Sequence, residues 1–214
     1  MKSYDALIIG GGVIGASIAY HLAKKGLKKI CVIDKGSPAS GSTGKATGGY
    51  RAQFGSEINI RLSLLSKNKL ISFKEETGVD PGYKPYGYLF AAQNEEEFTK
   101  LKMANSLQQS FGVDDAKLIT AEGIKILNPY IAHTSIIGGT FCQSDGFITP
   151  LNILKGYAEA AKRLGVEFIY SSEVTSINVK DGSIASVNTL NENYSAGVVI
   201  NAAGAWAGTI GQLA

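Results

Sequence analysis

Apolar and polar residues follow a pattern along the chain that predicts a mixed α/β fold. Short uninterrupted apolar runs at residues 4–10 and 29–34 are typical of buried strands. Between them, apolar residues at positions 14, 18, 19 and 22 recur with helical spacing, and Gly26 follows two lysines as a stop signal. Two strands joined by one helix within about 30 residues predict a parallel pair with a right-handed crossover.

The rest of the pattern predicts four further helices and several strands. Helices are expected over residues 58–77, 94–110, 120–127 and 150–164, the last with Thr149 as its N-cap and Pro150 at its first position. Strands are expected at the end of residues 79–92 and over 136–142, 166–170, 173–179, 183–189 and 198–201. Asp181-Gly182 is a hairpin signal between two of these strands.

Composition narrows the class of protein. A chain of 214 residues, 44% hydrophobic and 18% charged, is long enough to bury a core as one large domain or two small ones. The net charge of +3 is spread along the chain, which is not typical of a nucleic-acid interface. Cys31 and Cys142 lack metal-binding spacing, so no metal site is expected. No apolar run reaches the roughly 18 residues of a transmembrane helix, and we expect a cytoplasmic protein.

The 26 glycines include a pattern that predicts a dinucleotide site. Gly10, Gly12 and Gly15 form a G-x-G-x-x-G motif directly after the first predicted strand. In such motifs the first glycine allows a tight turn, the second lets a pyrophosphate approach the backbone, and the third lets helix and strand pack closely. Asp34, at the end of the second strand, is placed to accept hydrogen bonds from ribose hydroxyls. An ordinary βαβ unit with a glycine turn is the alternative.

Two further stretches of small residues favour FAD over NAD. FAD is the longer cofactor, and residues 36–49 are rich in Gly, Ser and Thr that could contact its pyrophosphate and ribityl chain. A flexible surface loop is the alternative for this stretch. Residues 198–206 form an apolar run that ends in small residues, against whose backbone a cofactor could lie. An ordinary strand-to-helix turn is the alternative there.

Residues 5–36, 40–54, 145–150 and 201–206 together resemble the D-amino-acid oxidase-like family of FAD-dependent oxidoreductases. Within it, the chain is similar to the branch of glycine oxidase, the sarcosine oxidase β-subunit and dye-linked proline dehydrogenase. The resemblance implies an α/β fold in which a Rossmann-like FAD-binding domain, residues 1–80 and 145–214, carries an inserted α+β substrate domain. Residues 81–144 would form part of that insertion, which is built on an antiparallel sheet. FAD would be held non-covalently, since Lys45 stands about where some relatives have a flavin-linked histidine.

The resemblance also implies which residues meet the cofactor and the substrate. The cofactor-binding positions are Gly10, Gly12, Val13, Ile14, Gly15, Asp34, Lys35, Ser42, Thr43, Ala46, Thr47, Gly48, Gly49, Val174, Ala203 and Gly204. Arg51 could hold a substrate carboxylate, with an exposed loop arginine as the alternative. No catalytic residue is assigned. We expect His21 and His133 to be structural or at the surface, and the aromatic residues at 83, 86, 88 and 90 to be core rather than a ligand cage.

The family chemistry implied for this chain is oxidation of the carbon–nitrogen bond of a small amino acid or secondary amine, with hydride transfer to the flavin. The expected partners are that substrate and either a partner subunit or an electron acceptor. Such enzymes continue well past residues 201–206, so the 214 residues correspond to about the first half of one. Two alternatives stay open. One is an FAD-binding fragment or subunit that is inactive without another chain segment, and the other is a hydroxy-acid or polyol dehydrogenase on the same scaffold.

Overall fold

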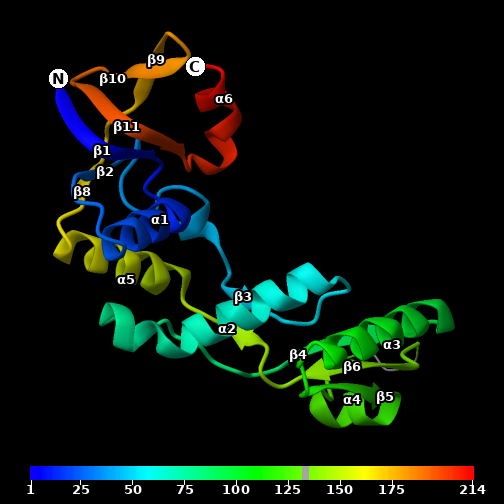
Figure 1. Cartoon of the computed structure of the whole chain (residues 1–214). Coiled ribbons are helices and arrows are strands. Elements are labelled where there is room, and N and C mark those ends of the chain that lie inside the picture. Colours follow the sequence, from blue (N-terminus) through cyan, green and yellow to red (C-terminus); the bar gives the residue numbers. More distant parts are fainter. Residues whose placement is uncertain (132–134) are drawn as a thin grey trace. The chain divides into compact units, whose positions relative to one another are not determined.

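The structure is a computed structural model that describes residues 1–131 and 135–214 (Figure 1). The described chain divides into two compact units. Unit 1 comprises Met1–Thr47, Phe73–Pro81 and Thr149–Ala214, and unit 2 comprises Gly48–Ser72 and the described part of Gly82–Ile148. Compared with the predicted domain ranges, residues 48–72 and 145–148 pack with the insertion. Tyr50 lies opposite Gly146 in a short strand pairing, and Ala52 and Ile60 share a hydrophobic cluster with residues of the insertion.

Unit 1 is built on a six-stranded sheet with the order β8-β2-β1-β11-β10-β9. Its strands are β1 (Lys2–Ile9), β2 (Ile30–Ile33), β8 (Glu167–Ile169), β9 (Val174–Lys180), β10 (Ser183–Thr189) and β11 (Asn193–Asn201). Its helices are α1 (Val13–Lys24), α5 (Pro150–Arg163) and α6 (Ala207–Gly211), with short 3-10 helices η1 (Ser42–Lys45) and η2 (Gly204–Trp206). β1 pairs in parallel with β2 and β11, and β10 pairs antiparallel with β9 and β11. The predicted parallel pair around one helix is therefore confirmed.

The side chains of β1 alternate between two hydrophobic clusters. Ala6 and Ile8 pack with residues of α1 and α5, which lie side by side in Figure 1. Leu7 and Ile9 pack on the opposite face with residues of β9, β10 and β11, among them the buried Tyr194. The central strand is thus buried on both faces, as its continuous apolar run predicts.

Local signals at the ends of these elements are largely confirmed. The Gly26 N–H donates to the Ala23 carbonyl and the Leu27 N–H to the Leu22 carbonyl, the two bonds of a Schellman motif. Asp181 and Gly182 have φ values of +52° and +73°, as a two-residue type I′ hairpin requires.

The start of α5 differs in one respect from its prediction. Thr149 is the N-cap and Pro150 follows it, but the Thr149 side chain makes no capping hydrogen bond within the described residues. Instead, its backbone N–H donates to the Pro81 carbonyl at 2.8 Å, and its own carbonyl accepts from Asn152 and Ile153. The backbone of residue 149 therefore joins α5 to the Phe73–Pro81 segment of unit 1.

Unit 2 contains a three-stranded antiparallel sheet with the order β4-β6-β5. Its elements are β3 (Gly49–Tyr50), all but the last turn of α2 (Glu57–Thr77), β4 (Tyr88–Ala92), α3 (Glu95–Ser110), β5 (Ala116–Thr120), α4 (Ala121–Leu127), β6 (Gly138–Cys142) and β7 (Gly146–Phe147). β3 pairs with β7 as a separate two-stranded ladder. The antiparallel sheet of the insertion is confirmed, although the sequence pattern did not predict β3, β5 or β7.

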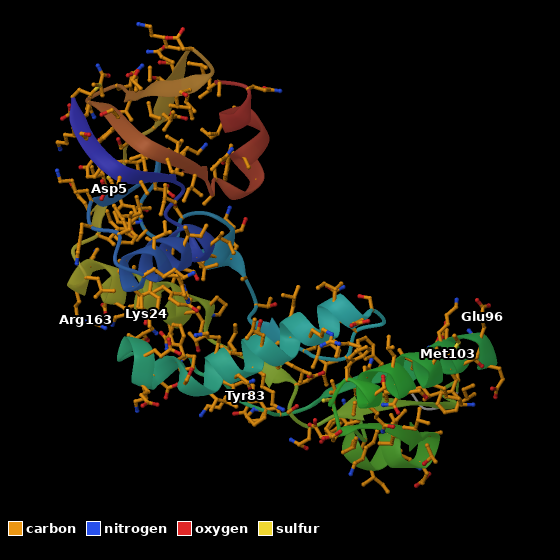
Figure 2. The ribbon with its side chains drawn as sticks, in the orientation of Figure 1. Asp5, Lys24, Tyr83, Glu96, Met103 and Arg163 are labelled. Carbon is orange, nitrogen blue, oxygen red and sulfur yellow. The ribbon has the colours of Figure 1, made fainter. Side chains whose placement is uncertain are left out.

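The last turn of α2 belongs to unit 1 and is tied to both of its large helices. Lys24 of α1 forms an ion pair with Glu76 at 3.0 Å, and Arg163 of α5 donates to the Thr77 carbonyl at 2.7 Å. Figure 2 labels both basic side chains. Between these contacts, the Phe73 ring packs edge-on against Tyr157, with ring centroids 5.0 Å apart.

The contact between α5 and this turn requires a glycine at position 156. A Cβ on Gly156 would lie 2.4 Å from Phe73 Cε1 and 2.8 Å from Thr77 Oγ1, both on buried side chains. We expect Gly156→Ala to lower the free energy of unfolding by about 1–3 kcal/mol, despite the better helix propensity of alanine. Urea denaturation measures this. Gly208→Ala in α6, where a Cβ meets open space, is the control, and an equal loss in both variants would contradict the prediction.

Candidate functional site

The turn between β1 and α1 is so tight that two of its glycines leave no room for a side chain. Gly10 has a φ of +114°, and a Cβ there would lie 2.3 Å from the Ala202 carbonyl oxygen. A Cβ on Gly15 would lie 1.9 Å from the Gly10 carbonyl oxygen. The structural roles predicted for these two glycines, a tight turn and close packing of helix and strand, agree with this geometry. Gly12 is different, because among the described residues only Thr43 Oγ1, at 3.3 Å, comes within 4 Å of its Cβ position.

The N-terminus of α1 opens from this turn at Gly12. As a glycine, this N-cap residue has no side chain with which to cap the first-turn amides. The Val13 N–H donates to Thr43 Oγ1 at 3.1 Å. The first-turn amides and the positive end of the helix dipole suit an anion such as a pyrophosphate. Val13 and Ile14, both predicted to contact the cofactor, lie in this first turn, and the Ile14 side chain is exposed.

Asp34 lies beside the turn, just after β2, with both carboxylate oxygens held by backbone amides. Its Oδ2 accepts from the Gly11 N–H at 2.6 Å and its Oδ1 from the Gly36 N–H at 2.8 Å. The residue is half-buried, so part of the carboxylate faces solvent. The remaining oxygen lone pairs can accept from a diol such as a ribose.

Tyr170 lies next to Asp34 and was not singled out from the sequence. Its Cε1 atom is 3.1 Å from the Cβ position of Gly11, which is also 3.3 Å from Asp34 Cβ. Burial, and then the negative charge of Asp34, raise the pKa of the Tyr170 phenol. The only sequence signal for this residue was an aromatic side chain at the end of a predicted strand.

The second small-residue loop is brought to the same place by Thr43. Besides the bond between Thr43 and Val13, the loop packs closely against its own backbone. A Cβ on Gly44 would lie only 2.1 Å from the Ala39 carbonyl oxygen. The side chains of Ser42, Ala46 and Thr47 are exposed. The stretch through residue 45 is therefore a folded turn against α1 rather than a loose surface loop.

Residues 201–206 complete the surroundings of the glycine turn. The Ala202 N–H donates to the Ile9 carbonyl at 2.8 Å, and Ala203 Cα is 3.0 Å from the Cβ position of Gly10. The Lys35 ammonium lies over the Trp206 ring, 4.2 Å from its centroid. Gly204 begins η2 directly after Ala203. The side chain of Val174 is buried in the core, so only the backbone of that residue is available for a ligand.

The remaining predicted site residues, Gly48, Gly49 and Arg51, belong to unit 2. A pocket of about 340 Å³ lies there, lined by Gly49, Tyr50, Arg51, Phe54, Ser63, Ser66 and Tyr88. The Arg51 guanidinium carbon lies 4.7 Å from the centre of the Phe54 ring, 5.4 Å from that of Phe90 and 5.9 Å from that of Tyr88. Arg51 is half-buried and forms no salt bridge with any acidic side chain that the structure describes. It is therefore not an exposed loop arginine.

The aromatic residues of positions 83–90 only partly match the predicted core. Tyr83 packs edge-on against Tyr50, with centroids 5.8 Å apart, whereas Tyr86 is 70% exposed. Tyr88 and Phe90 surround Arg51. The core assignment was wrong for Tyr86, because the turn at Gly87 directs this part of the segment toward solvent.

Among the described residues, neither a histidine nor a metal-binding cluster contributes a functional group to the site. His21 Nδ1 lies 2.8 Å from the Ser17 carbonyl oxygen, and its ring packs against Tyr20 and Tyr157, which is a structural role. His133 lies outside the described residues. Within residues 1–131 and 135–214, no group of three or more His, Cys, Asp or Glu could hold a metal ion. In the same residues, no helix combines the length and the apolar character that crossing a membrane requires.

Comparison with known proteins agrees with this arrangement. The model of the DAO family, described as FAD dependent oxidoreductase, matches residues 5–214. The chain is 30% identical to glycine oxidase of Geobacillus kaustophilus (strain HTA426), covering 97% of the chain and 56% of that protein. The crystal structure of L-proline dehydrogenase from P. horikoshii superimposes with a TM-score of 0.91 at 32% identity, covering 99% of the chain and 56% of that protein.

A further relative is named as a regulatory subunit and not as an oxidase or dehydrogenase. The chain is 27% identical to the mitochondrial pyruvate dehydrogenase phosphatase regulatory subunit of Mus musculus, covering 97% of the chain and 24% of that protein. The chain thus spans between a quarter and somewhat more than half of the length of these relatives.

The crowded Gly15 and the more open Gly12 allow a test of the geometry of the turn. We expect Gly15→Ala to lower the free energy of unfolding by about 1–3 kcal/mol. The new methyl group would collide with the Gly10 carbonyl, which belongs to the backbone and cannot move without displacing the turn. Gly12→Ala is expected to change it by less than about 1 kcal/mol, because the Thr43 hydroxyl can adjust. Urea denaturation of both variants measures the difference. A cost in Gly12→Ala as large as that in Gly15→Ala would contradict the assignment.

Proposed function

Because the chain belongs to the FAD dependent oxidoreductase family, we propose that it binds FAD and serves the oxidation of a small amino acid or secondary amine at its carbon–nitrogen bond. The observation that carries the proposal is the meeting of three separate segments at the N-terminus of α1. These are the glycine turn, the Thr43 loop and residues 201–206. Each is built from small residues, and together they leave backbone amides and Gly12 free to face a phosphate.

The residues present fit FAD, and each has a proposed task. The amides of Gly12 and Ile14 hold the pyrophosphate at the positive end of α1, and Val13 lies between them with its own N–H bound to Thr43. Asp34 accepts from the adenosine ribose, and its charge disfavours a cofactor with a 2′-phosphate. The proposed contacts of the other predicted positions are through backbone or small side chains: Gly10, Gly15, Lys35, Ser42, Thr43, Ala46, Thr47, Gly48, Gly49, Val174, Ala203 and Gly204.

Arg51 is proposed to bind the carboxylate of the substrate. A guanidinium binds a carboxylate through two parallel hydrogen bonds, which gives orientation as well as affinity. The three aromatic rings around Arg51 remove water from one face of the guanidinium, which strengthens its interaction with an anion. When bound, FAD supplies the two-electron oxidation by accepting a hydride from the carbon that bears the amine.

The second candidate is a subunit that binds a nucleotide without turnover of its own. The observation that favours it is the likeness to a protein whose name is that of a regulatory subunit. The proposed domain assignment is the same for both candidates. Residues 1–80 and 145–214 bind FAD, and residues 81–144 are part of the substrate domain.

Binding of FAD can be followed through Trp206, the one tryptophan of the sequence. We expect FAD to quench its fluorescence and to stay with the protein through gel filtration. Asp34→Asn should weaken binding of both FAD and ADP about tenfold or more, because a hydrogen bond to a charged group is worth about 1.5–3 kcal/mol. Glu122→Gln, at an exposed acid of α4 in unit 2, is the control. A protein that gains no flavin absorption after incubation with FAD would overturn the cofactor assignment.

Substrate class is tested on the FAD-loaded chain without oxygen. We expect sarcosine, proline or glycine to bleach the flavin absorption, since the proposed substrate carries both an amine and a carboxylate. Lactate or glycerol 3-phosphate bleaching the flavin in their place would favour a hydroxy-acid or polyol dehydrogenase. A flavin that no compound reduces would favour the subunit without turnover.

A further inference from the structure

A single buried carboxylate connects two walls of the unit 2 pocket. Asp145 is fully buried, and its Oδ1 accepts from the Ala52 N–H at 2.7 Å. That N–H belongs to the peptide bond between Arg51 and Ala52, so the carboxylate holds the backbone of Arg51 directly. Oδ2 accepts from Gln53 Nε2 at 3.1 Å, and the same nitrogen donates to the Tyr88 carbonyl at 2.8 Å. Arg51 and Tyr88 both line the pocket.

Two other hydrogen bonds, one buried and one partly buried, hold the segment on either side of Arg51. The Tyr50 hydroxyl donates to the Ser63 carbonyl at 2.7 Å, and both residues line the pocket. At the far end of the segment, Gln108 Nε2 donates to the Phe54 carbonyl at 3.1 Å. The backbone around Arg51 is therefore held at both ends, with the Asp145 carboxylate between them.

The turn that carries Asp145 is itself held from two sides. The Tyr83 hydroxyl donates to the carbonyl of Ser144, and Tyr83 is labelled in Figure 2. Asp115 accepts from the Ser144 N–H at 2.6 Å. A turn fixed in this way presents the Asp145 carboxylate in one position.

Stability alone does not account for a carboxylate at this place. Among the described residues, no basic side chain forms a salt bridge with Asp145, and its partners are neutral groups, namely the amides of Ala52 and Gln53 and the Cys142 thiol. Burial raises the pKa of Asp145, which means that burying its charge costs free energy. What the buried carboxylate does is hold two amides at defined positions. One is the backbone amide beside Arg51, and the other is the glutamine side-chain amide beside Tyr88.

We propose that Asp145 is a positioning residue for Arg51. By holding the Arg51–Ala52 peptide, it orients the guanidinium over its three aromatic rings, so that its free edge faces a carboxylate in the pocket. Through Gln53 it keeps the Tyr88 wall at a matching position. This inference rests on the proposed function in one respect, namely that Arg51 binds a carboxylate.

The test measures binding of benzoate to the 214-residue chain by NMR titration, with benzamide as the uncharged probe of the same shape. Asp145→Asn keeps the size of the side chain but removes one of its two acceptor oxygens. We expect it to weaken benzoate binding about tenfold and to leave benzamide binding unchanged. Arg51→Ala should abolish the preference for benzoate. The control is Ile124→Val, a change at a buried residue of α4 in the same unit, which should leave both affinities within about twofold.

A second readout uses the unaltered protein and does not depend on how a variant folds. The Ala52 amide signal should shift with benzoate at the same midpoint as the Arg51 side-chain signal. The proposal is overturned if Asp145→Asn, folded by its amide spectrum, binds benzoate as the unaltered chain does, or if the Ala52 signal does not respond. Failure of Arg51→Ala to weaken benzoate would instead overturn the carboxylate role of Arg51, and FAD binding is measured independently of both.

Discussion

The close approach of α1 to β1 is the constraint on which the proposed cofactor site depends. With the Gly15 Cβ position 1.9 Å from the Gly10 carbonyl oxygen, no other residue type fits without moving the helix away from the strand. At this separation the first turn of α1 lies within hydrogen-bond reach of Thr43, and the Gly11 amide reaches Asp34. The pairing of β11 with β1 brings the Ala202 carbonyl against Gly10, which adds the C-terminal segment to the turn. A helix packed further out would separate its first turn from the Thr43 loop.

Both units use a carboxylate to hold backbone amides, but with different consequences. In unit 1, Asp34 joins the Gly11 and Gly36 amides and remains half-buried, so it can still accept from a ligand. In unit 2, Asp145 is fully buried, so its effect is transmitted only through the groups that it holds. The exposure of the two groups therefore separates a direct binding role from a positioning role. The sequence pattern predicted the role of Asp34 but gave no role to Asp145.

Elements with a strong local pattern were predicted well from the sequence. α1, α3 and α5 have helical spacing and recognisable ends, and the Asp181-Gly182 hairpin has residues that tolerate positive φ. Elements that depend on distant partners were missed or shortened. β3 and β7 are two-residue strands that exist only because they pair with each other. β11 begins at the polar Asn193, five residues before the predicted start, because its first residues pair with β10.

The sequence by itself determined the glycine turn, the acid at the end of the second strand and the family to which the chain belongs. These depend on residue types at short, regular spacings, where local backbone geometry dictates the choice. Only the tertiary structure decided that Thr43 meets Val13, that Tyr170 stands beside Asp34, and that Asp145 holds the Arg51 peptide across 93 positions of sequence. Such contacts arise from how separate elements pack, and a hydrogen bond between distant residues leaves no periodic trace in the order of the amino acids.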